Sequence, residues 1–590
     1  MKNLGFPAFL LPLLAAAAGC ASERSNRAGD EPMTNDDALV VWCAGRDALL
    51  SDPLDAGLCR ALSMADDRLL ELPAELGKPA VPGPLFRLIF DALAAPLSLR
   101  FDPLPGAEGS PVPPIEAQLT VHGTRAEAQA IGAQFAAVVG AMLPAPASPA
   151  EIAGLSHLPT PAGEVFFGVP GDVPERFVVS LGAPDCGALG LGSLDLPAGV
   201  EPILAFKLDF GRLRPLLDLV FAQAGPAAEP MRAQLEAVGL LGTEPLLVTA
   251  AVGRERDRLR FASRVVNYTA LAERTGALVT EPLTAAELCL VPADATTAAL
   301  YKTDFSALID QFEAAIPQEE LDLRGLARAM LGFDLDADLF DHLGTTAGYY
   351  LSETTGGGGL ASLVVFVAVS GRDELGATGD LLQGMLNDLA TGEARGYVRI
   401  RDWQNGEHLC HSLSFPGLPI PLEPSLALIE GWLLAAATPQ ALVAAIEQAA
   451  GSGPGLAAHP GFRAAEVGPR DDLLSVSFTD TAAALPGGYG LAALVASALA
   501  NGVRSPASPD RDPGLVLPPY LDLAKGARAT VAVSRLVGND LVTLGEADGS
   551  MVVNTTALLG HPFGKLLLAG GALAALAPVF LMARVASFPD

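Results

Sequence analysis

A unit made of a strand followed by a helix recurs along this chain, and it constrains the possible folds more than any other feature. In each copy a short apolar run leads directly into a helical pattern. The segment FKLDF at 206–210 aligns closely with YKTDF at 301–305. The four units begin at Ala38, Ile203, Ala298 and Leu473. Repetition of one unit predicts a duplicated fold in which strands and helices alternate.

An aspartate stands at the junction between strand and helix in three of the four units. Asp209, Asp304 and Asp480 occupy this position, and Gly45 takes it in the first unit. An aspartate at a helix N-cap accepts hydrogen bonds from backbone N–H groups that lack a partner in the first turn. We therefore interpret the three aspartates as helix caps rather than as catalytic acids.

A longer repeat contains these units. The segment 119–143 is similar to 367–389, and each has the pattern of a strand, a glycine turn and an amphipathic helix. Hairpin signals follow each segment, and Asn405-Gly406 is a typical hairpin turn. These patterns favour antiparallel strands with helices packed against them.

The fold class that we predict is therefore α+β, with two related halves over 38–288 and 289–556. Each half is expected to hold a mixed or mainly antiparallel sheet with helices packed on it. A C-terminal hydrophobic helix is expected within 557–590.

The N-terminus predicts an exported protein. Lys2 precedes an apolar run, and small residues then lead to Cys20, which is the layout of a secretory signal. It resembles the bacterial lipoprotein signal, in which the cysteine becomes the lipid-modified first residue. The resemblance implies a signal peptide over 1–19, lipidation of Cys20 and a polar tether over 20–37. An ordinary secretory signal with a coincidental cysteine is the alternative.

The segment Leu566–Ala583 contains no charged residue and is close to the minimum length that spans a bilayer. Lys565 and Arg584 flank it. We predict a membrane anchor here, and the alternative is a hydrophobic helix packed on the protein itself. An anchor in this segment and a lipidated Cys20 would most simply lie in one membrane.

The charge balance excludes nucleic acid as a partner. Acidic residues outnumber basic ones by 67 to 37, for a net charge of −30, and a polyphosphate is repelled by such a chain. The predicted partners are a membrane, contacted through Cys20 and Leu566–Ala583, and an envelope protein or lipid ligand.

Export also permits disulfides. Apart from Cys20 the chain has five cysteines, and Cys43 and Cys59 are the pair closest in sequence. A bridge between them is possible, and burial of each as a small hydrophobic side chain is the alternative.

The segment EHLCH is the best metal candidate because it offers three kinds of ligand. It follows a turn and has the pattern of a strand, so His408 and Cys410 are expected on one face and His411 on the other. Two ligands on one face do not complete a zinc site, which needs four. No nucleophile elbow, Walker A loop or other catalytic motif occurs in the sequence, so neither a catalytic residue nor a cofactor is predicted.

The order of these patterns resembles a broad, uncharacterised family of exported bacterial proteins with duplicated strand–Asp–helix units. The segments 290–309 and 343–352 carry the resemblance, which extends over most of 38–550. It implies an envelope location and transfers no catalytic residues. We expect a membrane-anchored envelope lipoprotein, without enzymatic activity, that faces the periplasm or the cell exterior as a binding or structural module. The alternatives are a carrier of lipid or another apolar ligand, and an envelope hydrolase with dispersed catalytic residues.

Overall fold

The computed structural model describes residues 37–560 with several gaps. The residues left out within that range are 66, 69, 72–82, 104–114, 143–146, 161–162, 186–195, 226–228, 238–240, 242–245, 316–322, 333, 354, 356–358, 393–396, 420–421 and 468–469. The predicted lipidation site, Cys20, and the predicted anchor, Leu566–Ala583, lie outside the described residues.

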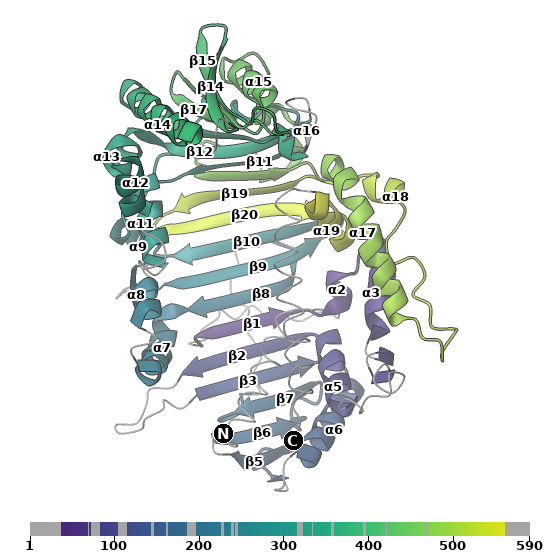
Figure 1. Ribbon diagram of the computed structural model, residues 1–590. Coiled ribbons are helices and arrows are strands. Elements are labelled where there is room, and N and C mark those ends of the chain that lie inside the picture. The colour runs from purple at the N-terminus through teal and green to yellow at the C-terminus, as the bar shows by residue number, and fades with distance from the viewer. Residues whose placement is uncertain are drawn as a thin grey trace.

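The strands of the described chain join one antiparallel sheet (Figure 1). The strands before residue 267 pair in the order β4-β5-β6-β7-β3-β2-β1-β8-β9-β10. Their bounds are β1 (Leu39–Cys43), β2 (Leu97–Pro103), β3 (Ile115–His122), β4 (Ser148–Pro149), β5 (Leu155–Thr160), β6 (Gly163–Gly168), β7 (Arg176–Leu181), β8 (Glu201–Asp209), β9 (Leu247–Glu255) and β10 (Arg258–Val266).

The strands after residue 294 pair in a matching order, β14-β15-β16-β17-β13-β12-β11-β18-β19-β20. Their bounds are β11 (Ala295–Lys302), β12 (Leu343–Ser352), β13 (Val364–Val369), β14 (Arg399–Asn405), β15 (His408–Ser414), β16 (Ser425–Ile429), β17 (Trp432–Ala436), β18 (Ser475–Thr479), β19 (Thr530–Val537) and β20 (Asp540–Asp548).

The pairing of β10 with β20 joins the two sets of strands. A tight turn precedes each of these two strands. Arg256 in the turn before β10 and Gly538 in the turn before β20 have positive φ angles. Ala262 lies six residues after Arg256, and Leu544 lies six residues after Gly538. These two residues face one another in the register. The pairing of β10 with β20 is therefore symmetric about Ala262 and Leu544. Two copies of one hairpin that pair edge to edge would have the same symmetry.

Helices follow both ends of the strands. In Figure 1, α7, α8, α9 and α11 lie along the left ends, and α2, α3, α17 and α19 lie along the right ends. The helices of the first part are α2 (Arg46–Leu49), α3 (Ala56–Ser63), α5 (Gly83–Ala94), α6 (Arg125–Met142), α7 (Phe210–Ala224), α8 (Glu229–Ala237), α9 (Tyr268–Arg274) and α10 (Ala285–Leu288). Those of the second part are α11 (Phe305–Ala315), α12 (Leu323–Leu331), α13 (Leu335–Asp338), α14 (Arg372–Gly392), α15 (Pro439–Ala449), α16 (Pro460–Ala464), α17 (Thr481–Val503), α18 (Tyr520–Ala524) and α19 (Met551–Gly560). Short 3-10 helices are η1 (Pro53–Asp55), η3 (Phe340–His342), η4 (Gly359–Ser362) and η5 (Leu456–Ala458).

The main cores of the two parts lie on opposite faces of the sheet. In the first part, Val121 and Phe177 pack with α5 and α6, whereas in the second Leu300 and Phe366 pack with α15 and α16. Val121 and Ala299 belong to one row of cross-strand partners, which runs through every strand between β3 and β11. Their side chains therefore lie on the same face of the sheet, and Leu300 is the residue next to Ala299. Adjacent residues of a strand point to opposite faces, so the helical layers cover opposite sides.

The prediction of a mixed fold of helices and antiparallel strands is confirmed. One continuous sheet takes the place of the separate sheet expected for each half, because β10 pairs with β20 edge to edge. The proposed boundary after residue 288 also cuts through a core. Leu283 and Leu288 pack with the buried side chains of the second part.

Candidate functional site

Helix α17 is the most unusual surface element of the described chain. Asp480 begins it, and its carboxylate accepts the backbone N–H of Ala483 at 3.2 Å. The helix is rich in alanine and leucine and contains no charged residue. Within the described residues it is the helix that is long and apolar enough to cross a membrane.

One side of α17 exposes apolar side chains to the surroundings. Leu491, Leu494 and Val495 are 40%, 69% and 56% exposed, and their spacing puts them on one face. Leu521 of α18 and Leu558 of α19 are also exposed beside this helical cluster. We call Leu491, Leu494 and Val495 the apolar face. It is an uncharged surface on a chain whose net charge is −30.

Nearer its N-terminus, α17 packs very closely on α19. A Cβ atom at Gly488 would collide with the backbone of Thr556 and Gly560, and one at Gly560 would collide with the backbone of Ala484. Small residues four apart allow two helix backbones to approach in this way, as they do in helix pairs within membranes. Leu485 and Val553 fill the buried space next to this crossing. The chain therefore leaves the described fold, at Gly560, in contact with α17.

A polar hollow of about 450 Å³ lies at the C-terminal end of α17. Arg68, Arg504 and Arg511 line it. Arg511 donates two hydrogen bonds to Glu71, at 2.6 and 2.7 Å, and these bonds hold the pKa of that carboxyl below its usual value. Arg504 contacts Asp512 at 2.9 Å. Glu71 and Asp512 thus each bind an arginine that lines this hollow.

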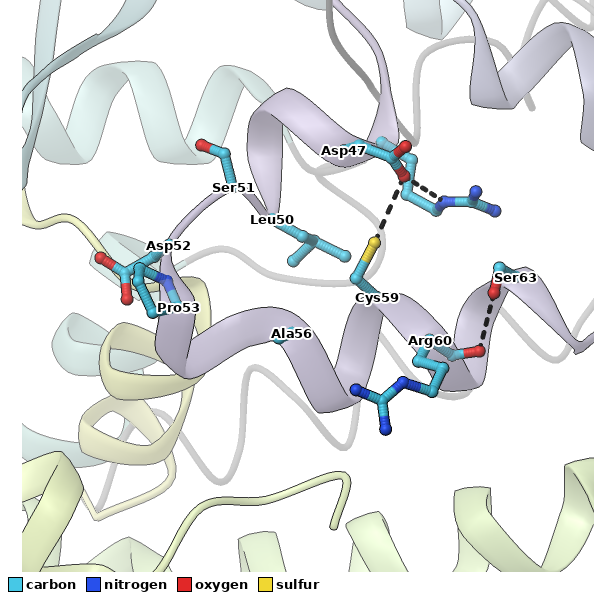
Figure 2. Close-up of a pocket in the computed structure, with 10 residues that line it drawn as sticks. Asp47, Leu50, Ser51, Asp52, Pro53, Ala56, Cys59, Arg60 and Ser63 are labelled. Carbon is cyan, nitrogen blue, oxygen red and sulfur yellow. Dashed lines mark hydrogen bonds and ion pairs between the residues drawn. The ribbon is translucent and has the colours of Figure 1, made fainter. Parts of the chain in front are cut away.

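A second hollow, of about 480 Å³, lies between α2 and α3 (Figure 2). The thiol of Cys59 donates a hydrogen bond to Asp47 at 3.2 Å, and Arg46 contacts the same carboxylate at 3.1 Å. Burial and the neighbouring Asp47 raise the pKa of the Cys59 thiol. A thiol whose pKa is raised is a poor nucleophile, so this hollow does not favour thiolate chemistry.

The bridge suggested between Cys43 and Cys59 is not formed in the structure. Neither cysteine is in a disulfide. Cys43 ends β1 and faces a buried core, where it packs with Leu97, whereas Cys59 points to Asp47 from α3.

The aspartates interpreted as helix caps stand at helix starts. Asp209 accepts the N–H of Arg212 at 3.2 Å, and Asp304 accepts the N–H of Ala307 at 2.9 Å. Asp480 caps α17 and also lies 3.3 Å from the buried ring of His459, a contact that lowers the pKa of the carboxyl. None of these contacts brings the three aspartates together.

The metal candidates are divided between the two faces of β15. Cys410 is completely buried, and His411 lies on the opposite face, where its Nδ1 is 3.0 Å from Asp402. His408 begins the strand, opposite Asn405. Among the described residues no group of three or more potential ligands could hold a metal ion.

A buried polar pair that the sequence did not indicate lies at the ends of β2 and β3. The hydroxyl of Ser98 is 3.2 Å from Nε2 of His122, and the ring of Trp42 meets the imidazole edge-on at 5.2 Å. Burial, together with the positive charge of Arg176, lowers the pKa of His122 to about 4. The imidazole is therefore neutral at physiological pH. Neighbouring strands create this pair, and no local motif marks it.

Replacement of His122 by glutamine is expected to remove a pH-dependent part of the stability. Between pH 6.5 and 4 the unfolded chain binds a proton that the folded chain excludes, so this contribution is lost as the pH falls through that window. The loss is about 3 kcal/mol for such a shift. Urea unfolding of both proteins at pH 7 and pH 4 measures it. A stability difference between them that does not change with pH would contradict the expectation.

Comparison with family models, with curated proteins and with solved structures found no match to this chain. The resemblance to exported bacterial proteins therefore stays a prediction, and the apolar face of α17 with its flanking arginines is the candidate site.

Proposed function

We propose that this protein is a membrane-anchored lipoprotein of the cell envelope that acts as a binding or structural module. The apolar face of α17 carries the proposal. It is exposed and uncharged, and it lies on the helix that touches Gly560, where the chain continues toward Leu566–Ala583. A contiguous exposed apolar surface is typical of a membrane or protein contact.

The lengths of the flanking segments are compatible with two attachments to one membrane. Five residues separate Gly560 from Leu566, and they reach at most about 18 Å. Residues 20–36 precede the described fold and reach at most about 60 Å. A lipidated Cys20 and a C-terminal anchor can therefore serve the same bilayer while the sheet stands outside it.

We also propose that the two parts of the sheet are related halves produced by duplication. Two observations support this: the strands of both parts pair in a matching order, and the β10–β20 joint is symmetric about Ala262 and Leu544. Closed two-fold pairing is the commonest arrangement of identical chains. A fused pair would keep that arrangement within one chain.

The structure gives less support to a carrier of apolar ligands. The two hollows described above are lined largely by charged and polar side chains, including Arg46 and Arg504. A cavity for an apolar ligand is expected to be lined mainly by hydrophobic side chains.

Cell fractionation with radiolabelled palmitate tests the proposed anchoring. The full chain is expected in the membrane fraction with label. Cys20→Ser is expected to lose the label yet stay in that fraction through residues 561–590, and removal of both attachments is expected to release the protein. Cys289→Ser, which removes an exposed free thiol, is the matched control and is expected to keep the label. An unlabelled, soluble full chain would refute the proposal.

A further inference from the structure

We propose that α17 lies along the surface of the lipid bilayer with its apolar face, Leu491, Leu494 and Val495, among the lipids. This proposal rests on the proposed membrane anchoring and adds the orientation of the protein on the membrane. The buried side of the same helix, through Leu485 and Gly488, attaches it to the rest of the fold.

The first support is the composition of α17 on both of its sides. A helix at the surface of a soluble protein normally places charged residues outward, whereas a helix that is apolar all round is covered by protein or by lipid. The outward side of α17 carries Leu491, Leu494 and Val495 together with small residues and two uncharged polar ones, Ser497 and Asn501, and Leu494 is 69% exposed. Among the described residues this side of α17 is exposed, although its composition is typical of a helix that protein or lipid covers.

The second support is the distance to the predicted anchor. Gly560 touches Gly488 of α17, and the uncharged segment begins at Leu566. An anchor that starts there holds the membrane surface within about 18 Å of Gly560. Gly560 is the last residue of α19, so this attachment brings α19, and α17 packed on it, toward the bilayer.

The third support is the charge at the end of the helix. Arg68, Arg504 and Arg511 surround the hollow next to the C-terminus of α17. Arginine at the end of an apolar helix reaches the headgroup layer and its phosphates. Of these side chains Arg504 is 45% exposed, whereas Arg68 and Arg511 are 12% and 14% exposed, so Arg504 is the one placed to meet a headgroup phosphate.

The packing of α17 favours a position along the surface rather than across the membrane. Its N-terminus is fixed by Asp480 at the end of β18, and its inner side contacts α3, α18 and α19 over its length. A helix attached in this way can insert its outer face by the depth of a side chain layer, as interfacial helices do.

Tryptophan quenching by brominated lipid tests the position of the apolar face. The full chain carrying Leu494→Trp is reconstituted in vesicles of phosphatidylethanolamine and phosphatidylglycerol, with or without bromine on the acyl chains. Leu426→Trp is the matched control, because Leu426 is an exposed leucine of β16 that is 43% accessible. The native tryptophans, at 42, 403 and 432, are common to both proteins.

The emission added at position 494 is expected to fall by roughly half in brominated vesicles, and that at 426 to be unchanged. Emission from 494 that resembles that of the water-exposed control would overturn the proposal. Blue-shifted emission that brominated lipid does not quench would also overturn it, in favour of cover by residues 566–583 or by a second copy. Flotation of the vesicles is measured first, so that failure of anchoring is distinguished from failure of this orientation.

Discussion

Replacement of Arg260 by methionine is expected to lower the free energy of unfolding by about 3–5 kcal/mol. Arg260 lies in β10, at the joint of the sheet, and its side chain is only 3% exposed. Its guanidinium contacts Glu546 across the joint and Glu255 at 2.8 Å in the adjoining strand. Glu466, from the segment that follows α16, approaches the same group.

The large effect follows from the carboxylate that would remain. Glu546 is 10% exposed, and loss of Arg260 leaves it the longer contact with Arg258, at 3.4 Å, and little access to water. Arg264→Met is the matched control in the same strand. Arg264 contacts Asp540 at 2.9 Å but is 30% exposed, so its loss is expected to cost about 1 kcal/mol or less.

Urea unfolding followed by circular dichroism compares the two variants with the unmodified chain. Equal decreases in the free energy of unfolding for Arg260→Met and Arg264→Met would contradict the expectation that the buried ion pair at the joint contributes more than the exposed one.

Replacement of Asp55 by alanine is expected to cost about 4 kcal/mol. Asp55 is completely buried and ends η1, yet its carboxylate bonds to the start of α19, almost 500 residues later in the chain. It accepts the hydroxyl of Ser550 at 2.6 Å and the N–H groups of Met551 and Val552 at 2.9 Å. Alanine would leave three buried donors without an acceptor, and each such donor costs about 1–3 kcal/mol.

The neighbouring Asp52 provides the control for this prediction. It accepts the N–H of Leu54 at 2.9 Å as the cap of η1, so Asp52→Ala is expected to cost about 1 kcal/mol. Hydrogen exchange of α19 gives a second measurement, because loss of its cap is expected to reduce protection from Met551 onward. An Asp55→Ala protein with normal stability and normal protection of α19 would refute the assignment.

Local features of the fold could be predicted from the sequence. Asp209 and Asp480 end strands and start helices, and this signal lies within a few residues of each junction. The hairpin of β14 and β15 was also predictable from its glycine. β14 ends at Asn405, β15 begins at His408, and Gly406, in the two-residue turn between them, has a positive φ angle. Such signals depend only on neighbouring residues.

The continuous sheet could not be predicted in this way, because it depends on pairing between distant segments. Arg258 faces Asp548 in the joint, and no local pattern distinguishes that pairing from two separate sheets. The same reason hides the contact of Ser98 with His122 and the cap that Asp55 gives to α19. The exposure of Leu494 likewise depends on which elements happen to cover α17.

The two outer strands determine where the sheet stops growing. At a spacing of about 4.8 Å between strands, the described sheet extends roughly 90 Å from β4 to β14. β4 consists of Ser148 and Pro149 alone, and proline has no N–H with which to pair a further strand. β14 carries Arg399, Arg401 and Asp402, and charged side chains oppose docking of another edge. Both outer strands therefore disfavour polymerisation by edge-to-edge addition, and each molecule keeps a ribbon of defined length.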